Sequence, residues 1–270
     1  MSFSASYFRT VIVQCLVKLP LSIIIPTYNE AENIAALLQQ LTWADEIIVV
    51  DSFSTDDTPV IVQNTTATLL QRVYQGPADQ KNWAIRQAKH QWVLILDADE
   101  RLTPLLTQEI KEIVNRPTIK YAGYYLYRQN YFMGKKINYS GLQRDRVIRL
   151  IQRDLCAYNN KQVHEEIETE GKIGYLNHKL EHFTYKNLAH FLAKNERYGL
   201  WSAQDHFLKV PQVTFYHLWF KPLGRFLNQY LFKKGFLDGQ AGFIFCVIMA
   251  WGVFLRYVKI KEMRQEGYQK

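Results

Sequence analysis

The chain has 270 residues, 48% of them hydrophobic, and carries a formal net charge of +8 at pH 7. This length suits one large α/β domain or one domain with an appendage, and the hydrophobic content excludes an intrinsically disordered chain. The positive charge favours an anionic partner, such as a nucleotide, a nucleic acid or an acidic membrane surface. The cysteines, Cys15, Cys156 and Cys246, are scattered and odd in number, which fits a reducing compartment better than a disulfide framework or a zinc site.

Strand and helix patterns alternate from residue 21 onward. Residues 1–20 have only a short apolar run and no cleavage site of small residues, so we interpret them as an N-terminal extension rather than a signal peptide. Short apolar or β-branched runs predict strands at residues 21–26, 46–50, 69–74 and 92–96. Apolar residues at helical spacing predict helices at 31–41, 58–63, 77–89 and 104–115. This alternation predicts an α/β fold with a doubly wound, mostly parallel sheet and flanking helices.

The pattern changes after residue 116. Further strands are predicted at residues 121–132, 146–151, 162–168 and 175–183. A helix is predicted over 187–207, followed by a basic, aromatic segment at 220–237 and an almost wholly apolar run at 241–255. We therefore divide the chain into an extension (1–20), an α/β domain (21–186) with halves at 21–116 and 117–186, and a helical C-terminal region (187–270).

The predicted strand at residues 92–96 leads directly into Asp97, Ala98 and Asp99. In open α/β sheets, ligands bind outside the carboxyl ends of the strands. Two carboxylates at such an edge repel each other unless a positive charge lies beside them, and oxygen-rich sites of this kind suit Mg²⁺ or Mn²⁺ with a bound phosphate. The pattern therefore predicts a divalent cation that holds a diphosphate. The alternative is that Asp97 or Asp99 caps the helix that begins near Pro104.

Polar residues follow two other predicted strands as well, at residues 27–30 and at Asp51 and Ser52. Neighbouring strand ends in a parallel sheet lie about 4.8 Å apart, so these groups share one crevice with the Asp97 pair. A crevice that spans these three strand ends has a size that suits a nucleotide. Neither G-x-G-x-x-G after the first strand nor a P-loop motif is present, which argues against dinucleotide and P-loop sites.

Four ordered motifs resemble those of the family 2 glycosyltransferases, which have the GT-A fold. They are I-I-I-P-T-Y-N-E (23–30), V-V-D-S-F-S-T-D-D-T (49–58), G-P-A-D-Q-K-N-W-A-I (76–85) and L-D-A-D-E-R-L (96–102). The second half resembles the lipopolysaccharide-core branch related to the β-1,4-glucosyltransferases. That likeness rests on V-H-E-E (163–166), L-E-H-F-T-Y (180–185) and K-G-F-L-D-G-Q-A-G-F (234–243). The family pattern often has glycine where Phe53 and Asp57 stand, so the shape of that turn differs or is reached without glycine.

The resemblance implies a nucleotide-sugar site. Its residues would be Pro26, Thr27, Tyr28, Glu30, Asp51, Ser52, Asp79, Lys81, Asp97, Ala98 and Asp99. Thr27, Tyr28 and Asp51 would hold the base and ribose, since Tyr28 offers a stacking face and Asp51 accepts hydrogen bonds. Asp97 would contact the ribose, and Asp99, together with Asp97, would bind Mn²⁺ or Mg²⁺.

Several further residues are open between a functional and a structural role. Lys81 would pair with phosphate, whereas Asp79 is either a site residue or an ordinary acid at a helix start. His182 is a candidate metal or phosphate ligand or a hydrogen-bonded structural residue. Four arginines form a basic cluster, for which pyrophosphate or an anionic glycolipid is the expected partner: Arg144, Arg146, Arg149 and Arg153.

The base that deprotonates the acceptor hydroxyl is expected in V-H-E-E, where the resemblance points to Glu165. Glu166 is the second candidate, and it would face the opposite side if this segment is a strand. The structural alternative for both is a solvated acidic strand end.

The apolar run at 241–255 is 15 residues long, short of the ~20 that a spanning helix needs. Basic residues precede it, namely Lys221, Arg225, Lys233 and Lys234. This arrangement favours an interfacial membrane anchor, with a buried helix or a homodimer contact as alternatives.

Together these observations predict an inverting, metal-dependent glycosyltransferase at the cytoplasmic face of the membrane. It would move a hexose, with UDP-glucose as the expected donor, to a saccharide or lipid-linked acceptor of the lipopolysaccharide-core type, without a nucleic-acid partner. One alternative is a nucleotidyltransferase of similar fold, which would carry a glycine-rich basic loop where P-T-Y-N-E stands. Another is a non-catalytic protein that binds a nucleotide or a membrane.

Overall fold

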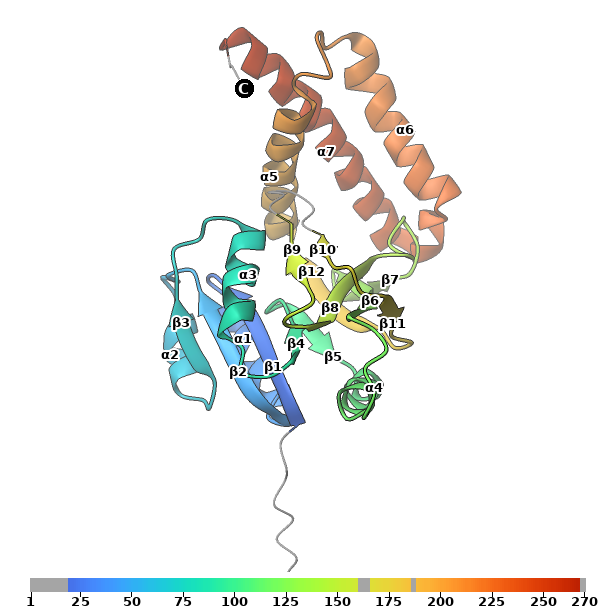
Figure 1. Cartoon of the computed structure of the whole chain (residues 1–270). Coiled ribbons are helices and arrows are strands. Elements are labelled where there is room, and N and C mark those ends of the chain that lie inside the picture. Colours follow the sequence, from blue (N-terminus) through green and yellow to red (C-terminus); the bar gives the residue numbers. More distant parts are fainter. Residues whose placement is uncertain (1–18, 160–165, 186–187, 268–270) are drawn as a thin grey trace, which may run out of the picture.

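The computed structural model describes residues 19–159, 166–185 and 188–267. Figure 1 shows an α/β domain with a group of long helices standing at one end of it. The main sheet has the order β3-β2-β1-β4-β8-β6-β12-β5, with β7 and β11 also paired to β6. Its first half consists of β1 (Leu19–Thr27), β2 (Ala44–Asp51), β3 (Thr68–Gln71) and β4 (Trp92–Ile95). Its second half consists of β5 (Glu100–Leu102), β6 (Gly123–Phe132), β7 (Lys135–Ile137), β8 (Arg146–Gln152), β11 (Ile173–Tyr175) and β12 (Leu180–Tyr185).

The predicted parallel half of the sheet is confirmed. Strand β1 lies between β2 and β4 and is parallel to both. Its helices are α1 (Ala31–Gln40), α2 (Thr58–Gln63), α3 (Pro77–Gln87) and α4 (Pro104–Val114). The other neighbour of β4 is β8, which runs antiparallel and starts the second half of the sheet. The sheet is therefore mixed: β1 to β4 run parallel to one another, and the antiparallel pairing begins at β8.

Alternation along β1 explains how both faces of the sheet are covered. Ile23 and Ile25 are fully buried on one face, in a cluster with Leu37 of α1 and Ile110 of α4. Ile24 is fully buried on the other face, in a cluster that includes Ile85 of α3. Successive side chains of a strand point to opposite faces, so the continuous apolar run of β1 fills two cores.

Two predicted strands are wrong in their extent. The segment at 175–183 is not one strand, because β11 ends at Tyr175 and β12 begins at Leu180. Between them, the Glu109 carboxylate accepts hydrogen bonds from the backbone N–H of Asn177 at 2.9 Å and contacts Nδ1 of His178 at 2.9 Å. Of the predicted strand at 162–168, residues 162–165 lie outside the described residues and only β10 (Ile167–Glu168) is a strand, paired with β9 (Ala157–Tyr158).

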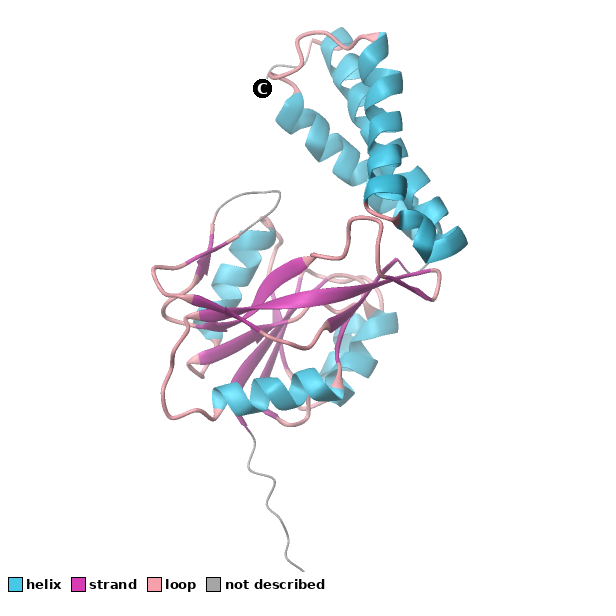
Figure 2. Ribbon diagram, turned by 90° about the vertical axis from the view of Figure 1, so that its right-hand side faces the viewer, coloured by secondary structure: helices cyan, strands magenta, loops and turns pink. Residues whose placement is uncertain are grey.

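The C-terminal region is helical, as predicted, and helix α5 (Leu188–His206) matches its predicted bounds closely. The basic, aromatic segment forms η1 (Tyr216–Phe220), α6 (Lys221–Leu227), η2 (Asn228–Phe232) and η3 (Gly235–Asp238), where η1 and η2 are π-helical. Figure 2 shows these helices packed together, beyond the edge of the sheet. The chain ends its described part in α7 (Gly239–Gln265).

Helix α7 is the spine of this region. Its first half packs through Phe245 and Cys246 against Phe132 of β6, and its second half packs through Ile260 against Phe207. Within the described residues, the segment Gly235–Gln265 is the one helix long and apolar enough to cross a membrane by length and composition, with a mean hydropathy of 1.9, and 39% of its apolar stretch is buried in the protein. The helix continues through Arg256, so it is longer than the apolar run alone indicates.

Candidate functional site

The structure brings the three polar strand ends to one edge of the sheet. Thr27 at the end of β1 lies opposite Asp51 at the end of β2 in the strand register. The backbone N–H of Ser52 donates to the carbonyl of Thr27 at 2.9 Å, and the N–H of Leu96 donates to the carbonyl of Ile24 at 2.9 Å. The backbone ladder therefore continues to the last residues before the acids and fixes their positions.

Asp51 is fully buried and held by its own turn. Its carboxylate accepts hydrogen bonds from the backbone N–H and the hydroxyl of Ser54, and from Nε2 of Gln71 at 3.1 Å. Phe53 adopts the left-handed conformation, with a φ of 61°. Glycine reaches this conformation without strain, which is a physical reason for the glycine of the family pattern, and this chain adopts the conformation with phenylalanine. Asp57 precedes α2 without capping it through its side chain.

Thr27 and Tyr28 offer groups that nothing in the described protein uses. The hydroxyl of Thr27 is buried and has no hydrogen-bond partner among the described residues. Tyr28 is 57% exposed, so its ring face is accessible. Pro26 precedes them at the end of β1, and Glu30 begins α1 and accepts a hydrogen bond from Nδ2 of Asn33 at 2.6 Å. An orphaned buried hydroxyl beside an exposed aromatic ring suits a bound base and ribose.

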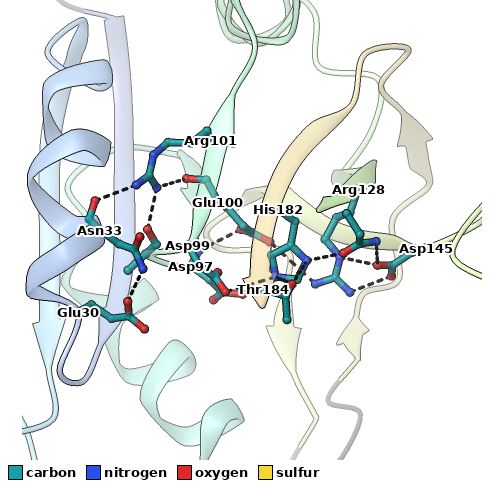
Figure 3. A network of polar contacts seen from close by, with 12 residues as sticks. Glu30, Asn33, Asp97, Asp99, Glu100, Arg101, Arg128, Asp145, His182 and Thr184 are labelled. Carbon is teal, nitrogen blue, oxygen red and sulfur yellow. Dashed lines mark hydrogen bonds and ion pairs between the residues drawn. The ribbon is translucent and has the colours of Figure 1, made fainter. Parts of the chain in front are cut away.

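The two acids after β4 have different surroundings (Figure 3). Asp97 pairs with the guanidinium of Arg149, which also donates to Oε1 of Glu100 at 2.8 Å. Burial opposes ionisation of Asp97, but the charges of Arg149 and Lys81 outweigh it and hold the pKa well below its usual range. Neither acid caps the following helix, because Thr103 accepts the capping hydrogen bond from the N–H of Leu106 at 3.2 Å.

Asp99 lacks such a guanidinium partner. Burial and the neighbouring Asp97 carboxylate raise the pKa of Asp99 to about 6. Its Oδ2 lies 3.6 Å from Nε2 of His182. Burial and the charge of Arg128 lower the pKa of His182 to about 3, so its imidazole is neutral near pH 7. The pair is thus a carboxylate beside a neutral imidazole, and the charges of Lys194 and Arg149 act on Asp99 from nearby.

Hydrogen bonds fix the His182 ring (Figure 3). Its Nδ1 lies 2.8 Å from Oδ1 of Asn130, and the hydroxyl of Thr184 lies 2.7 Å from Nε2. With the proton on Nδ1, the lone pair of Nε2 faces Asp99. His182 therefore has structural partners and also keeps a ring nitrogen directed at the candidate metal-binding carboxylate.

Further charged residues lie next to the Asp97–Arg149 pair. Glu100 is fully buried, and burial together with the Asp97 carboxylate raises its pKa to about 7. Arg128 of β6 lies 3.9 Å from Glu100 and holds Asp145 in a bidentate pair at 3.0 and 2.8 Å. Glu100, Arg128 and Asp145 were not predicted as site residues. Glu100 directly follows the two acids, at the start of β5, whereas Arg128 in β6 and Asp145 just before β8 are brought together by the antiparallel pairing of β6 with β8, which no local pattern signals.

Helix α5 supplies another residue that the sequence analysis missed. Burial lowers the pKa of Lys194, while the carboxylates of Asp99 and Asp97 oppose that shift. The ammonium group therefore lies in the field of both acids. Ala98 between them is buried, and its carbonyl accepts a hydrogen bond from Arg101 at 2.7 Å.

The predicted cluster of four arginines is wrong as a single surface. Only Arg149 joins the site. Arg146 lies over the rings of Tyr125 and Tyr175, at 4.6 and 5.4 Å from their centres. Arg153 pairs with the adjacent Asp154 on the surface. Arg146 is the first residue of β8, Arg149 lies buried within the strand, and Arg153 lies beyond its end at Gln152, so this basic stretch of sequence reaches three different surroundings.

Helix α3 separates the two residues predicted at its start. Asp79 pairs with Arg72 at 2.8 Å, which supports the structural reading of this acid. Lys81 is buried, lies 5.0 Å from the ring centre of Tyr158, and lowers the pKa of Asp97. Asn82 clamps the backbone of Tyr158 with two hydrogen bonds of 2.8 Å. Tyr158 is the last residue of β9, and these hydrogen bonds therefore fix the end of β9 beside Lys81. The chain continues from this point to Glu165.

The first candidate for the base, Glu165, lies outside the described residues. Glu166 is exposed, and its backbone N–H donates to Oδ1 of Asn159 at 3.1 Å. It precedes β10 and is not in a strand, so the predicted strand alternation does not decide between the two glutamates.

The side chains at this site would supply part of the coordination shell of a divalent cation. In the part of the chain that the structure describes, no three His, Cys, Asp or Glu side chains gather as a complete metal site. Asp99 and His182 supply a carboxylate oxygen and a neutral nitrogen, whereas Asp97 is engaged by Arg149. Mg²⁺ and Mn²⁺ sites commonly use one or two protein ligands and take the remainder from phosphates and water.

Comparison with known proteins gives three findings. The family model described as Glycosyl transferase family 2 matches residues 22–167. A lipopolysaccharide core biosynthesis glycosyltransferase, LpsC of Rhizobium meliloti, is 30% identical over 90% of this chain and 92% of its own length. An uncharacterized glycosyltransferase of Rickettsia typhi is 27% identical over 90% of this chain and 87% of its own length.

Two solved structures were also matched. Staphylococcus aureus TarS 1-349 aligns over 92% of both chains with a TM-score of 0.45 and 15% identity. Glucosyl-3-phosphoglycerate synthase from Mycobacterium tuberculosis, in complex with Mn²⁺ and UDP, aligns over 42% of this chain and 44% of that chain with a TM-score of 0.33 and 19% identity.

Replacing Arg149 tests the charge arrangement. We expect Arg149→Gln to lower the free energy of unfolding by about 3–5 kcal/mol, because it leaves the carboxylates of Asp97 and Glu100 without their partner. Urea unfolding at pH 8 measures the change. Arg153→Gln is the matched control, since it removes a surface pair with Asp154 and a hydrogen bond to the carbonyl of Ala88 and should cost much less. Equal losses in the two variants would contradict the assigned role of Arg149.

Proposed function

The chain belongs to glycosyl transferase family 2, and from that premise we propose that it transfers a hexose from a nucleoside-diphosphate sugar to a saccharide or lipid-linked acceptor. UDP-glucose is the expected donor. This proposal rests mainly on one observation: Thr27, Asp51 and Asp99 lie at or just after the carboxyl ends of three adjacent strands, at the same edge of the sheet. The likeness to LpsC, a lipopolysaccharide core biosynthesis glycosyltransferase, supports an acceptor of the lipopolysaccharide-core type.

The donor would lie across the carboxyl ends of β1, β2 and β4. Tyr28 stacks on the base, and the unused hydroxyl of Thr27 makes a hydrogen bond to it. Both oxygens of Asp51 accept hydrogen bonds from Ser54 or Gln71, so a contact with the base or ribose would be made in exchange for one of these. Asp97 contacts the ribose, and Ser52, Ala98 and Glu30 line the site. The buried Lys81 supplies positive charge for the diphosphate.

Asp99 and His182 are the residues that would hold Mn²⁺ or Mg²⁺. The bound cation supplies Lewis-acid neutralisation of the diphosphate as it leaves. The protein contributes a carboxylate without a guanidinium partner and a neutral imidazole beside it. Lys194 adds a further positive charge from α5. This division of roles keeps Asp97 paired with Arg149 and Asp99 directed at the cation.

An inverting transfer needs one base to take the proton of the acceptor hydroxyl. We assign this role to Glu165, with Glu166 as the second candidate. The support is the position of strand β9, which Asn82 clamps beside Lys81 and which leads into the segment with both glutamates.

We place the enzyme in the cytoplasm, peripheral on the inner face of the cytoplasmic membrane. The support is the excess of basic residues in the C-terminal region and the expected lipid-linked acceptor. Nucleotide sugars and a lipid acceptor meet at such a surface.

Removing the Asp99 carboxylate tests the metal assignment. We expect Asp99→Asn to lower Mn²⁺-dependent transfer, and UDP release from a UDP-sugar, by about 100-fold or more, because the cation contributes several kcal/mol to the leaving group. The melting temperature of the ligand-free protein should be unchanged.

In the wild type, the affinity for Mn²⁺–UDP should also fall as the pH drops through about 6, since a proton then occupies Asp99.

Asp45→Asn is the control for the Asp99→Asn variant, because Asp45 is a partly exposed acid that pairs with Lys89 and His90 away from the site. Full activity and unchanged Mn²⁺ dependence in Asp99→Asn would remove the metal from Asp99.

Removing the Thr27 hydroxyl tests the nucleotide site. Thr27→Val should leave the stability of the ligand-free protein unchanged or raised, because an unpaired buried hydroxyl is lost. UDP affinity, measured by calorimetry, should fall roughly 2- to 12-fold through the loss of one hydrogen bond. Thr58→Val should behave oppositely, with lower stability, since the hydroxyl of Thr58 accepts from the N–H of Glu30 at 2.8 Å. Unchanged UDP affinity in Thr27→Val would place the nucleotide elsewhere.

Paired substitutions test the base. Glu165→Gln should retain UDP-sugar binding and lose transfer by about 100-fold or more, as expected for loss of a general base. Glu166→Gln should retain both UDP-sugar binding and transfer. Loss of transfer in Glu166→Gln alone would move the base by one residue, and full transfer in both variants would remove it from this segment.

A further inference from the structure

The structure presents an apolar stripe along the segment 215–238, which we call the arm. It comprises η1, α6, η2 and η3, and Figure 1 shows it running alongside α7 beyond the sheet. Five apolar residues recur in it at intervals of four, and all are exposed: Phe215, Trp219, Leu223, Leu227 and Leu231. Residues four apart lie on one face of a helix, so they form a continuous line. Phe215 and Trp219 are 66% and 65% exposed.

The opposite face of the arm is firmly held. Phe226 and Tyr230 pack against the cluster that contains Phe245 of α7. Gln229 is buried and donates to the carbonyl of Ser140 at 3.0 Å. The exposed stripe is therefore the outer face of a docked helix rather than part of a loosely attached one. Large exposed apolar patches on a well-packed element mark interaction surfaces.

The arm carries positive charge without matching acid. Its basic residues are Lys221, Arg225, Lys233 and Lys234. Asp238 is the only acid between residues 207 and 261, and its carboxylate already accepts hydrogen bonds from the backbone of Asn138 and Tyr139 at 2.9 and 3.0 Å. Burial and the like charge of Arg256 lower the pKa of Arg225, so two guanidinium groups lie near each other. An anionic partner would relieve this repulsion.

We propose that the arm lies in the plane of an anionic lipid bilayer, with the stripe in the interface and the basic residues among the lipid phosphates. An amphipathic helix with aromatic residues and lysines suits this position. Helix α7 buries Phe245, Ile248 and Ile260 and exposes Phe243, Val247 and Trp251 at 42–47%. The stripe exposes five apolar residues next to the basic residues of the arm, so we assign the main contact to the arm. A second copy of the chain on the stripe would bring the lysines and arginines of both arms together, which disfavours that occupant.

This docking would orient the site toward the membrane, and in that respect it rests on the proposed function. Helix α5 connects the two regions. Lys194 on α5 lies in the field of Asp99, and the next residue, Asn195, donates to the carbonyl of Ile248 in α7 at 2.6 Å. A Cβ added to Gly252 would lie 2.3 Å from Oδ1 of Asn195, so α5 and α7 are in close contact. Helix α5, which packs on α7, therefore also carries Lys194 near the acids of the site.

Vesicle flotation with the full chain tests the proposal. The vesicles contain phosphatidylcholine alone or with phosphatidylglycerol. We expect the wild type to float with the anionic vesicles and to be released by high salt. The triple variant Phe215→Ser, Trp219→Ser, Leu223→Ser should bind about 100-fold more weakly, because it removes the apolar contact. The matched control is Val60→Ser, Leu105→Ser, Leu155→Ser, which removes equally exposed apolar residues from the α/β domain and should bind as the wild type does.

A charge variant separates the two contributions. Lys221→Gln with Lys233→Gln should weaken binding to anionic vesicles about 25-fold, since each basic residue near such a surface contributes roughly a fivefold effect. Binding to phosphatidylcholine alone should not change.

Three results would overturn the proposal. They are failure of the wild type to float with anionic vesicles, equal flotation of the stripe variant and its control, and a concentration-dependent dimer that the stripe variant abolishes without vesicle binding. UDP release from a UDP-sugar in solution should be the same in wild type and stripe variant, which also shows that the variant is folded. Absence of UDP release in all proteins, with flotation preserved, would count against the proposed function and leave the docking intact.

Discussion

The pairing of Arg149 with both Asp97 and Glu100 is the interaction on which the candidate site depends. A buried guanidinium between two carboxylates joins β8 to the end of β4 and to β5. Such a pair contributes little net stability but is costly to break from one side. Its consequence is positional, because it fixes Asp97 and leaves the neighbouring Asp99 without a guanidinium partner. The charges of Arg149, Arg128, Lys81 and Lys194 all act on these acids. Of the three acids, only Asp97 and Glu100 contact a guanidinium among the described residues, which leaves Asp99 as the carboxylate that would take a divalent cation.

The same arrangement explains why the two halves of the sheet are both needed. The parallel half delivers Thr27, Asp51 and the acids to one edge, where a nucleotide fits. The antiparallel half delivers Arg149, and through Asn130 and Thr184 it sets the orientation of His182. Helix α5 then adds Lys194 from above and connects the site to the helical region. Donor binding, cation binding and the proposed membrane contact thus share one packed framework.

The sequence allowed the parallel half and its acids to be predicted, because each depends on a short local pattern. The apolar run before Asp97 and the helical spacing in α1 are signals of that kind. Glu100 directly follows the two acids in the sequence, but Arg128 and Asp145 were not predictable, since the antiparallel pairing of β6 with β8 brings them together. The separation of Arg146, Arg149 and Arg153 follows from their positions at the start of β8, within it and beyond its end at Gln152, which a count of basic residues conceals. The break between β11 and β12 arises from contacts of Glu109, which lies far away in the sequence.

A crystal structure of the protein with Mn²⁺ and UDP tests the central claim most directly. The account predicts one metal ion with Asp99 and His182 in its shell, the uracil against Tyr28 with the Thr27 hydroxyl engaged, and the Asp97–Arg149 pair retained. Metal and nucleotide density on another surface, with Asp51 and Asp99 in contact with neither, would contradict it.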